Sequence, residues 1–211
     1  MYSDRIADNL FRIRIPFEEI STTVYLAVYN QGVAIIDSGT YNSDVDNYII
    51  PALNELGIET GKVKHLLLTH THGDHAGGIR RLAELIPEAK AGFLSSIDIQ
   101  NAATVTDGET LLGGLQVIHL PGHTKDSVGY YDIKTRTLLS GDCLQLKGIG
   151  KYRKGIGYPE LYAQSIYRLM KIKPERIVAA HEYDPLGSLA EGRAEVERYL
   201  SVCLAECKRK P

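Results

Sequence analysis

Residues 66–78 constrain the fold more than any other stretch, because an apolar run is followed at once by a dense cluster of polar side chains. The run Leu66–Leu68 is typical of a buried strand, and four residues of metal-binding types follow it closely: His70, His72, Asp74 and His75. Residues two apart in an extended segment point to the same side, so His70 and His72 can bind one ion. A turn at Gly73 directs Asp74 and His75 to a neighbouring position. A polar loop with solvated histidines is the alternative, but this density of zinc-type ligands favours a metal site.

The remaining sequence alternates between strand and helix patterns, which predicts an α/β fold. Strands are expected at residues 11–15, 22–29, 33–37, 63–68, 90–94, 115–120, 127–132, 137–140 and 176–180. Helices are expected at residues 42–56, 74–86, 96–103, 159–171 and 188–208. Pro16 is expected to separate the first two strands, and Pro51 to kink or break the first helix. With 211 residues and no low-complexity stretch, we expect residues 1–211 to form one domain.

Three more polar residues occupy the same kind of position as the first cluster. His123 lies in a Pro-Gly-His-Thr turn after the strand expected at 115–120, Asp142 follows the strand at 137–140, and His181 follows the strand at 176–180. Taken singly, each has an ordinary structural explanation as a turn, cap or loop residue. Loops that follow strands gather at one end of the sheet in α/β proteins, where binding sites are built. Together these residues are therefore candidate ligands of the same metal centre.

The composition limits the partners and the location. The chain is 44% hydrophobic and 24% charged, with a net charge of −2, which does not favour nucleic acid or a membrane surface as a partner. No apolar run approaches the roughly 18 residues of a membrane span. The N-terminus is charged without an apolar run, and three cysteines form no disulfide framework. We therefore expect a cytoplasmic protein that acts on a small molecule; the sequence does not indicate its oligomeric state.

One segment could shape a substrate pocket. Residues 147–158 combine four basic residues, two tyrosines and four glycines, and begin shortly after Asp142. Tyr152 or Tyr158 could line the pocket or donate a hydrogen bond to an oxyanion, and the basic residues could favour an anionic substrate. A solvated surface loop is the alternative.

The pattern His-x-His-x-Asp-His at 70–75, with the Pro-Gly-His-Thr turn at 121–124, Asp142 and His181, resembles the metallo-β-lactamase-fold hydrolases. With the strand that ends in Asp37-Ser38-Gly39, the matching pieces run from residue 33 to 181. The resemblance implies a four-layer αββα sandwich with two metal ions at one edge of its sheets. It implies that His70, His72 and His123 bind the first metal, that Asp74, His75 and His181 bind the second, and that Asp142 bridges them. Asp37 would orient the ligand loop without binding metal.

The same resemblance implies an activity. The expected function is a binuclear metal-dependent hydrolase that uses a metal-bridging hydroxide to cleave an ester, thioester or lactone, with Asp74 also handling a proton. The cofactors would be two divalent ions, zinc or alternatively iron or manganese. The ligand pattern is similar to that of hydroxyacylglutathione hydrolases (glyoxalase II) and acyl-homoserine lactonases, although we expect the glyoxalase II C-terminal domain to be missing. A mononuclear iron oxidoreductase like the persulfide dioxygenases of this fold is the alternative.

Overall fold

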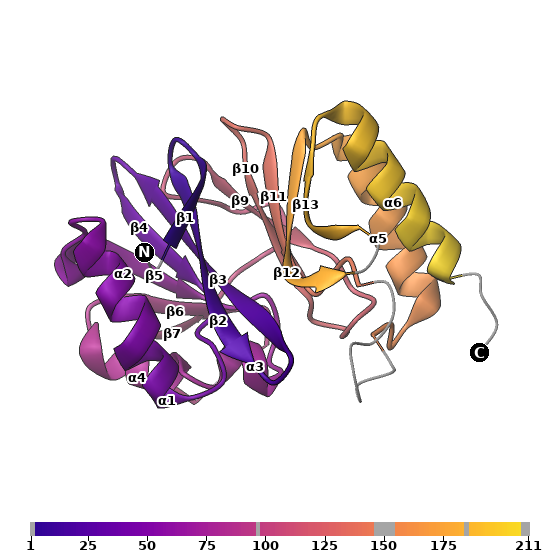
Figure 1. The fold of residues 1–211 in the computed structure, drawn as a ribbon. Helices are drawn as coiled ribbons and strands as arrows, with labels where there is room; N and C mark the ends of the chain where they lie inside the picture. The colour runs from indigo at the N-terminus through magenta and orange to yellow at the C-terminus, as the bar shows by residue number, and fades with distance from the viewer. Residues whose placement is uncertain (1–2, 96–97, 146–154, 184–185, 208–211) are drawn as a thin grey trace.

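Two β-sheets lie face to face at the centre of the computed structural model, which describes residues 3–95, 98–145, 155–183 and 186–207 (Figure 1). Within those ranges the first sheet has seven strands, which are neighbours in chain order: β1 (Ser3–Ala7), β2 (Leu10–Phe17), β3 (Ile20–Tyr29), β4 (Gly32–Ile36), β5 (Val63–Leu67), β6 (Lys90–Phe93) and β7 (Ala102–Thr104). Strands β1 to β4 pair antiparallel as successive hairpins. Strands β4 to β7 run parallel, which brings their C-terminal ends to one edge of the sheet.

The second sheet is formed by the second half of the chain. Its strands in the described residues follow the spatial order β13-β12-β11-β10-β9-β8. Their bounds are β8 (Thr110–Leu111), β9 (Leu115–His119), β10 (Val128–Asp132), β11 (Thr137–Gly141), β12 (Arg176–Tyr183) and β13 (Gly187–Glu191). Only β11 and β12 pair parallel in this sheet as described, and helix α5 connects them.

Helices cover the outer face of each sheet. On the first sheet they are α1 (Asn42–Asp44), a π-helical turn (Val45–Ile49), α2 (Ile50–Glu55), α3 (Gly73–Ala76) and α4 (Ile79–Leu85), and a 3-10 turn (Thr60–Lys62) without buried residues leads into β5. On the second sheet they are α5 (Pro159–Ile172) and α6 (Arg193–Cys207) (Figure 1). The helix expected at 42–56 thus changes from π to α geometry at Ile50, directly before Pro51, whose missing N–H cannot continue the regular hydrogen-bond ladder.

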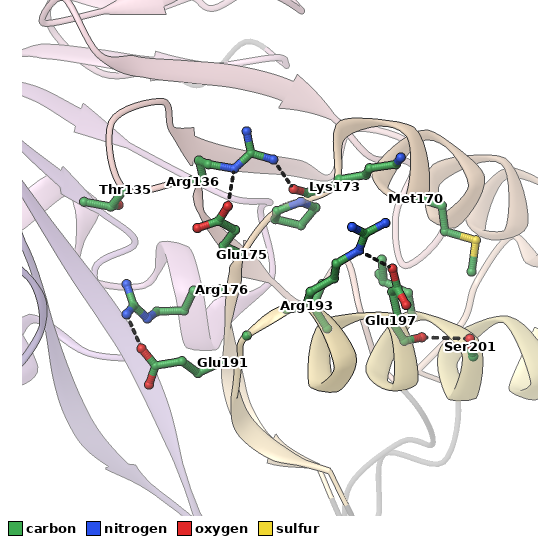
Figure 2. A pocket seen from close by; sticks show the side chains of 14 residues that line it. Thr135, Arg136, Met170, Lys173, Glu175, Arg176, Glu191, Arg193, Glu197 and Ser201 are labelled. Carbon is green, nitrogen blue, oxygen red and sulfur yellow. Dashed lines mark hydrogen bonds and ion pairs between the residues drawn. The ribbon is translucent and has the colours of Figure 1, made fainter.

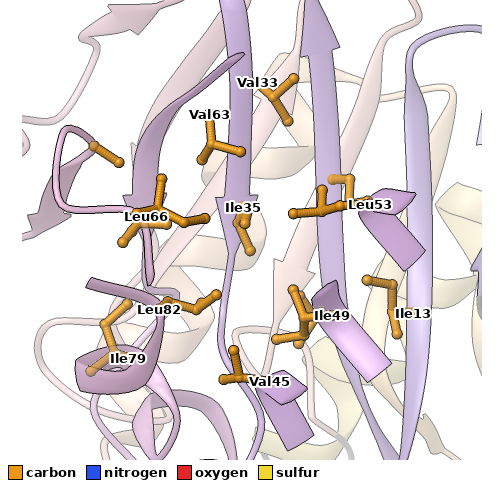
Figure 3. Packing of buried hydrophobic residues seen from close by; sticks show 14 of the residues in the cluster. Ile13, Val33, Ile35, Val45, Ile49, Leu53, Val63, Leu66, Ile79 and Leu82 are labelled. Atoms are coloured by element: carbon orange, nitrogen blue, oxygen red, sulfur yellow. The ribbon is translucent and has the colours of Figure 1, made fainter. Parts of the chain in front are cut away.

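Three apolar clusters hold these layers together, because successive strand residues point to opposite faces. Leu66 of β5 packs with Leu53 of α2 and Leu82 of α4 in the outer cluster shown in Figure 3. Its neighbour Leu67 points the other way, into the cluster between the two sheets. A third cluster joins the second sheet to α5 and α6, with Ile166 among its buried side chains. The layer order is therefore αββα, and the predicted sandwich is confirmed.

Two expectations for the helices were wrong. Residues 188–191 belong to strand β13, where burial alternates between buried Ser188 and Ala190 and exposed Leu189. Gly192, with φ +84°, then ends the strand, and α6 begins at Arg193. Around the expected helix 96–103, residues 96–97 lie outside the described residues, and the chain from Ala102 forms strand β7. In both places pairing with a neighbouring strand outweighs a local apolar pattern.

Pro16 does not separate two strands as expected, since it lies inside β2. Among the described residues, β1 pairs with β2 from Ser3 opposite Ile13, so at Pro16 strand β2 has a described hydrogen-bonding neighbour, β3, on one side alone. A proline without an N–H is tolerated at such an edge position.

Gly77 and Gly78 divide the helix expected at 74–86 into α3 and α4. A Cβ atom on Gly77 would lie 1.8 Å from the carbonyl oxygen of Thr40, and one on Gly78 would lie 2.3 Å from that of Ser38. The Gly77 N–H donates a hydrogen bond to Gly39 O at 3.0 Å. Because these positions lack side chains, α3 lies directly against the loop that follows β4.

Replacing Gly77 by alanine should therefore destabilise the protein by about 1–3 kcal/mol or more, since the clash is with backbone and a side-chain rotation cannot relieve it. Gly73→Ala is the matched control, because a Cβ there would meet nothing within 4 Å. Its free energy of unfolding should stay within about 1 kcal/mol of the wild type. Urea denaturation measures both values, and equal stabilities for the two variants would contradict the close approach.

No helix in the described part of the chain is long and apolar enough to cross a lipid bilayer.

Candidate metal centre

The seven predicted ligands meet between the ends of the two sheets. The first sheet contributes His70 and His72 after β5, and Asp74 and His75 from α3, whereas the second sheet contributes His123 after β9, Asp142 after β11 and His181 from β12. One placement differs from expectation: His181 lies within β12, which continues to Tyr183 instead of ending at residue 180. The register between β12 and β13 shifts after Val178, and such irregularities redirect strand side chains near functional sites.

Two sets of side chains face each other across Asp142. The first set is His70, His72 and His123, and the second set is Asp74, His75 and His181; in each, one ligand atom per residue lies within 4.8 Å of the others. In the first set, His123 Nε2 is 2.9 Å from His72 Nδ1 and 3.2 Å from His70 Nε2. In the second set, Asp74 Oδ2 is 3.3 Å from His181 Nε2 and 3.4 Å from His75 Nε2.

Asp142 presents one carboxylate oxygen to each set. Its Oδ2 lies 3.5 Å from His123 Nε2 and 3.9 Å from His70 Nε2, both in the first set. Its Oδ1 lies 3.3 Å from His181 Nε2 and 3.6 Å from His75 Nε2, both in the second set. The side chain is 3% exposed, so water does not screen these contacts.

Hydrogen bonds on the far side of four histidine rings determine which nitrogen faces the centre. His123 Nδ1 lies 2.6 Å from the carbonyl oxygen of Gly155, and His181 Nδ1 lies 2.8 Å from that of Ser21. A carbonyl oxygen only accepts, so both Nδ1 atoms carry a proton, and both Nε2 atoms point inward. His75 Nδ1 similarly donates to Asp37 Oδ2 at 2.7 Å.

Asp37 lies behind the ligand loop and organises it. Besides holding His75, it accepts hydrogen bonds from the backbone N–H of Thr69 at 2.7 Å and from the Thr69 hydroxyl at 2.8 Å. Because that hydroxyl proton goes to Asp37, Thr69 Oγ1 accepts from His70 Nδ1, 3.2 Å away. Asp37 has φ +66° and is 1% exposed, so its carboxylate is buried at the end of β4 in a conformation uncommon for aspartate.

The pKa shifts favour ionised carboxylates and a neutral His70. Burial would raise the pKa of Asp142, but the neighbouring His181 and His75 hold it well below its usual value. Asp74 behaves in the same way: the neighbouring His181 and His75 overcome the effect of burial and lower its pKa. Burial lowers the pKa of His70, and the charge of His75 adds to that shift. Burial also opposes the charged form of His181, yet Asp142 raises its pKa to about 9.

The residues fit divalent metal ions. His75 Nε2 is buried without a hydrogen-bond partner, although it faces two carboxylates. In the first set, the inward-facing Nε2 atoms of His70 and His123 are acceptors that would repel one another without a cation between them. Ligands arranged tetrahedrally at about 2.0–2.1 Å around a zinc ion lie about 3.3 Å apart. The separations of 2.9 to 3.9 Å within each set and from Asp142 to each set are close to that spacing.

A pocket of about 430 Å³ opens over the centre. His72, Asp74, His123, Asp142 and His181 line its floor, and Phe17, Ile20 and Tyr41 contribute apolar and aromatic surface. Tyr158 does not belong to this lining. Its backbone N–H donates to Gly122 O, and its ring is 41% exposed, with Lys125 Nζ 5.3 Å from the ring centre. Tyr152, the other tyrosine predicted for the pocket, lies outside the described residues.

Two buried residues at the centre carried no signal in the sequence analysis. Tyr183 donates a hydrogen bond from its hydroxyl to Asp142 Oδ1 at 3.0 Å. The side-chain amide of Gln145 donates to Asp142 Oδ2 at 2.5 Å. The only available hint was proximity in the chain, because Gln145 follows Asp142 by three residues and Tyr183 follows His181 by two.

A larger cavity of about 660 Å³ lies at the other end of the second sheet, between the start of β12 and helices α5 and α6 (Figure 2). Arg176 in its wall is five residues from His181, about 16 Å along an extended strand. Its arginine side chains pair with glutamates of the same wall: Arg136 with Glu175, Arg176 with Glu191, and Arg193 with Glu197. The cavity is thus separate from the candidate metal centre.

Comparison with known sequences identifies the relatives of this chain. A family model described as the metallo-beta-lactamase superfamily matches residues 18–96. The chain is 38% identical over 134 residues to a hydroxyacylglutathione hydrolase of Idiomarina loihiensis, covering 62% of this chain and 49% of that protein. It is 30% identical over 167 residues to a cytoplasmic hydroxyacylglutathione hydrolase of Arabidopsis thaliana, covering 73% and 64%. The chain spans 49–64% of the length of the first curated relatives it matches.

Solved structures share the fold. A metallo-beta-lactamase family protein from Thermus thermophilus superposes with a TM-score of 0.72 at 20% identity, covering 95% of this chain and 80% of that one. A flavo di-iron protein from Thermotoga maritima gives a TM-score of 0.76 at 18% identity, covering 100% and 63%. At these identities the likeness concerns the arrangement of the sheets and helices.

Proposed function

Because this chain belongs to the metallo-beta-lactamase superfamily, we propose that it is a hydrolase that uses two divalent metal ions to cleave an ester, thioester or lactone. The observation that carries this proposal is the placement of Asp142, whose two oxygens face two separate sets of ligands. Both sheets supply ligands, so we take residues 1–211 to act as one domain.

Each ligand is assigned to one of the two ions by the set of residues that its inward-facing nitrogen or oxygen atom approaches. The first set (His70, His72 and His123) would bind one ion, the second set (Asp74, His75 and His181) would bind the other, and Asp142 would bridge them. Imidazole nitrogen and carboxylate oxygen suit zinc, and the same donors accept iron or manganese. Asp37 would hold His75 in the orientation that directs Nε2 to the second ion.

Two ions held there would lower the pKa of a shared water toward neutrality and polarise the carbonyl of the substrate. The protein then has to position the substrate and move one proton. Phe17, Ile20 and Tyr41 offer apolar surface beside the centre on which an acyl group can lie. Asp74 is the residue assigned to the proton: its Oδ2 faces the second set, which would leave its other carboxylate oxygen to accept a hydrogen bond from the water or the departing group.

The glutathione substrate of the named relatives is not carried over to this chain. Because Phe17, Ile20 and Tyr41 line the pocket, we propose an ester, thioester or lactone whose acyl part is apolar. We place the activity in the cytoplasm, the location that the name of the Arabidopsis relative states.

Elemental analysis of protein purified without added metal, combined with a screen of thioesters, lactones and aryl esters, tests the proposal. Close to two zinc ions per chain together with hydrolysis of at least one substrate class is the expected result. One iron ion per chain with oxygen consumption would contradict it and would favour the persulfide dioxygenase-like alternative.

Replacing Tyr41 by alanine should raise KM for aryl and long-chain acyl substrates by about 3- to 10-fold, because an aromatic wall of the pocket is lost. Tyr41 is 65% exposed, so the fold tolerates the change. The kcat for an acetyl substrate should change little, since a small acyl group does not reach this side chain. Steady-state kinetics on both substrate types give the comparison.

Tyr167→Ala is the matched control for Tyr41→Ala. This tyrosine is 48% exposed on α5 and does not line the pocket. An equal rise in KM for both variants, or no difference between large and small acyl groups, would remove Tyr41 from the substrate pocket.

A further inference from the structure

We propose that Tyr183 and Gln145 are positioning residues that hold the two oxygens of Asp142 toward different metal ions. Tyr183 would control binding at the second set, and Gln145 would control binding at the first set. This inference rests on the proposed function, because it takes both sets to bind metal.

The two hydrogen bonds reach opposite oxygens of one buried carboxylate. The Tyr183 hydroxyl donates to Asp142 Oδ1 at 3.0 Å, and the Gln145 amide donates to Oδ2 at 2.5 Å. Two donors on different oxygens fix the plane of the carboxylate.

Each donor is bonded to the Asp142 oxygen that faces one set of ligands. Oδ1, which accepts from Tyr183, lies 3.3 Å from His181 Nε2 in the second set. Oδ2, which accepts from Gln145, lies 3.5 Å from His123 Nε2 in the first set. A carboxylate oxygen has two lone pairs, so the donor occupies one and leaves the other directed at its own set.

Both donors are themselves held in place. Tyr183 is 2% exposed within the cluster between the second sheet and its helices. Gln145 is 6% exposed, and its backbone carbonyl accepts a hydrogen bond from the Tyr162 hydroxyl of α5. The amide nitrogen of Gln145 must face Asp142, because its oxygen would repel the carboxylate. Turning away would cost Tyr183 the hydrogen bond of its buried hydroxyl and Gln145 that of its amide nitrogen, whereas Gln145 Oε1 has no partner in the present orientation.

Zinc titration in competition with a chromophoric chelator tests the assignment in two single-site backgrounds. His72→Ala leaves only the second set complete, and His181→Ala leaves only the first. We expect Tyr183→Phe to weaken zinc binding by about 10- to 100-fold in the His72→Ala background and to leave it unchanged in the His181→Ala background. Gln145→Met, which keeps the shape of the side chain without its amide, should give the reverse pattern.

Tyr199→Phe is the control for the loss of a buried tyrosine hydroxyl. Tyr199 lies in the same apolar cluster as Tyr183, but its hydroxyl donates to Gly187 O at 3.4 Å. It should bind zinc like the parent in both backgrounds. Thermal melts of the metal-free variants show whether each has folded. Should Tyr183→Phe fail to fold, Gln145→Met still tests the inference, because it is predicted on its own to weaken zinc binding at the first set and not at the second.

Equal weakening in both backgrounds, or none in either, would overturn the inference. Its failure is separable from that of the proposed function. A wild-type protein that binds no metal would contradict both, whereas a wild-type protein with two metal ions and hydrolytic activity, but without selective effects of Tyr183→Phe and Gln145→Met, would contradict the inference alone.

Discussion

Asp142→Asn should abolish turnover, with kcat/KM falling by more than about 100-fold, and should lower the metal content below two ions per chain. Loss of an outer partner of a metal ligand alone costs roughly 10- to 100-fold, so loss of a bridging ligand costs more. An asparagine keeps one oxygen and turns an N–H₂ donor toward the other set of ligands, and the negative charge between the two ions is lost. Kinetics and elemental analysis of the same preparation measure both effects.

Asp132→Asn is the matched control, because Asp132 is also fully buried but lies at the far end of β10. It accepts hydrogen bonds from the Tyr29 hydroxyl at 2.5 Å and from the Asn9 amide at 2.8 Å. Its replacement should cost about 1–3 kcal/mol of stability and leave the metal content unchanged. Full activity and two metal ions in Asp142→Asn would refute the bridging role.

Removing the metal ions with a chelator should lower the melting temperature by about 8–16 °C. A ligand present at a thousand times its Kd stabilises the folded state by about 4 kcal/mol, and 1 kcal/mol shifts the melting temperature of a protein of this size by about 2–4 °C. Without metal, the buried His75 Nε2 has no partner, and the inward-facing acceptors of the first set repel one another. Circular dichroism melts before and after dialysis against the chelator measure the shift.

Adding zinc back should restore the original melting temperature, whereas magnesium, which prefers oxygen ligands, should not. Elemental analysis of the dialysed protein verifies that the metal has been removed. Equal melting temperatures for metal-loaded and metal-free protein would show that the centre contributes nothing to the folded state.

Much of the fold followed from local patterns. The strands at 22–29 and 63–68 and the helix at 159–171 agree with β3, β5 and α5 within two residues at each end. These segments are predictable because their apolar residues recur with the period of a strand or of a helix. Strand β13 was missed, since its strand conformation depends on pairing with β12, which its own local apolar pattern does not encode.

The candidate ligands were also visible in the linear sequence. Metal chemistry requires particular residue types, and His70, His72, Asp74 and His75 stand too close together after an apolar strand to be a common surface loop. His123, Asp142 and His181 could be added because loops at the ends of strands converge in α/β folds. Residue identity therefore specified which side-chain atoms could bind a metal ion.

Folding specified how those atoms are directed. The inward orientation of His123 and His181 depends on carbonyl acceptors at Gly155 and Ser21, which are 32 and 160 residues away in the chain. The contact of Tyr183 with Asp142 spans 41 residues and depends on the register between β11 and β12. The sequence identifies the residues that can donate or accept, but strand pairing and packing between distant segments set the distance and angle at which each atom meets its partner.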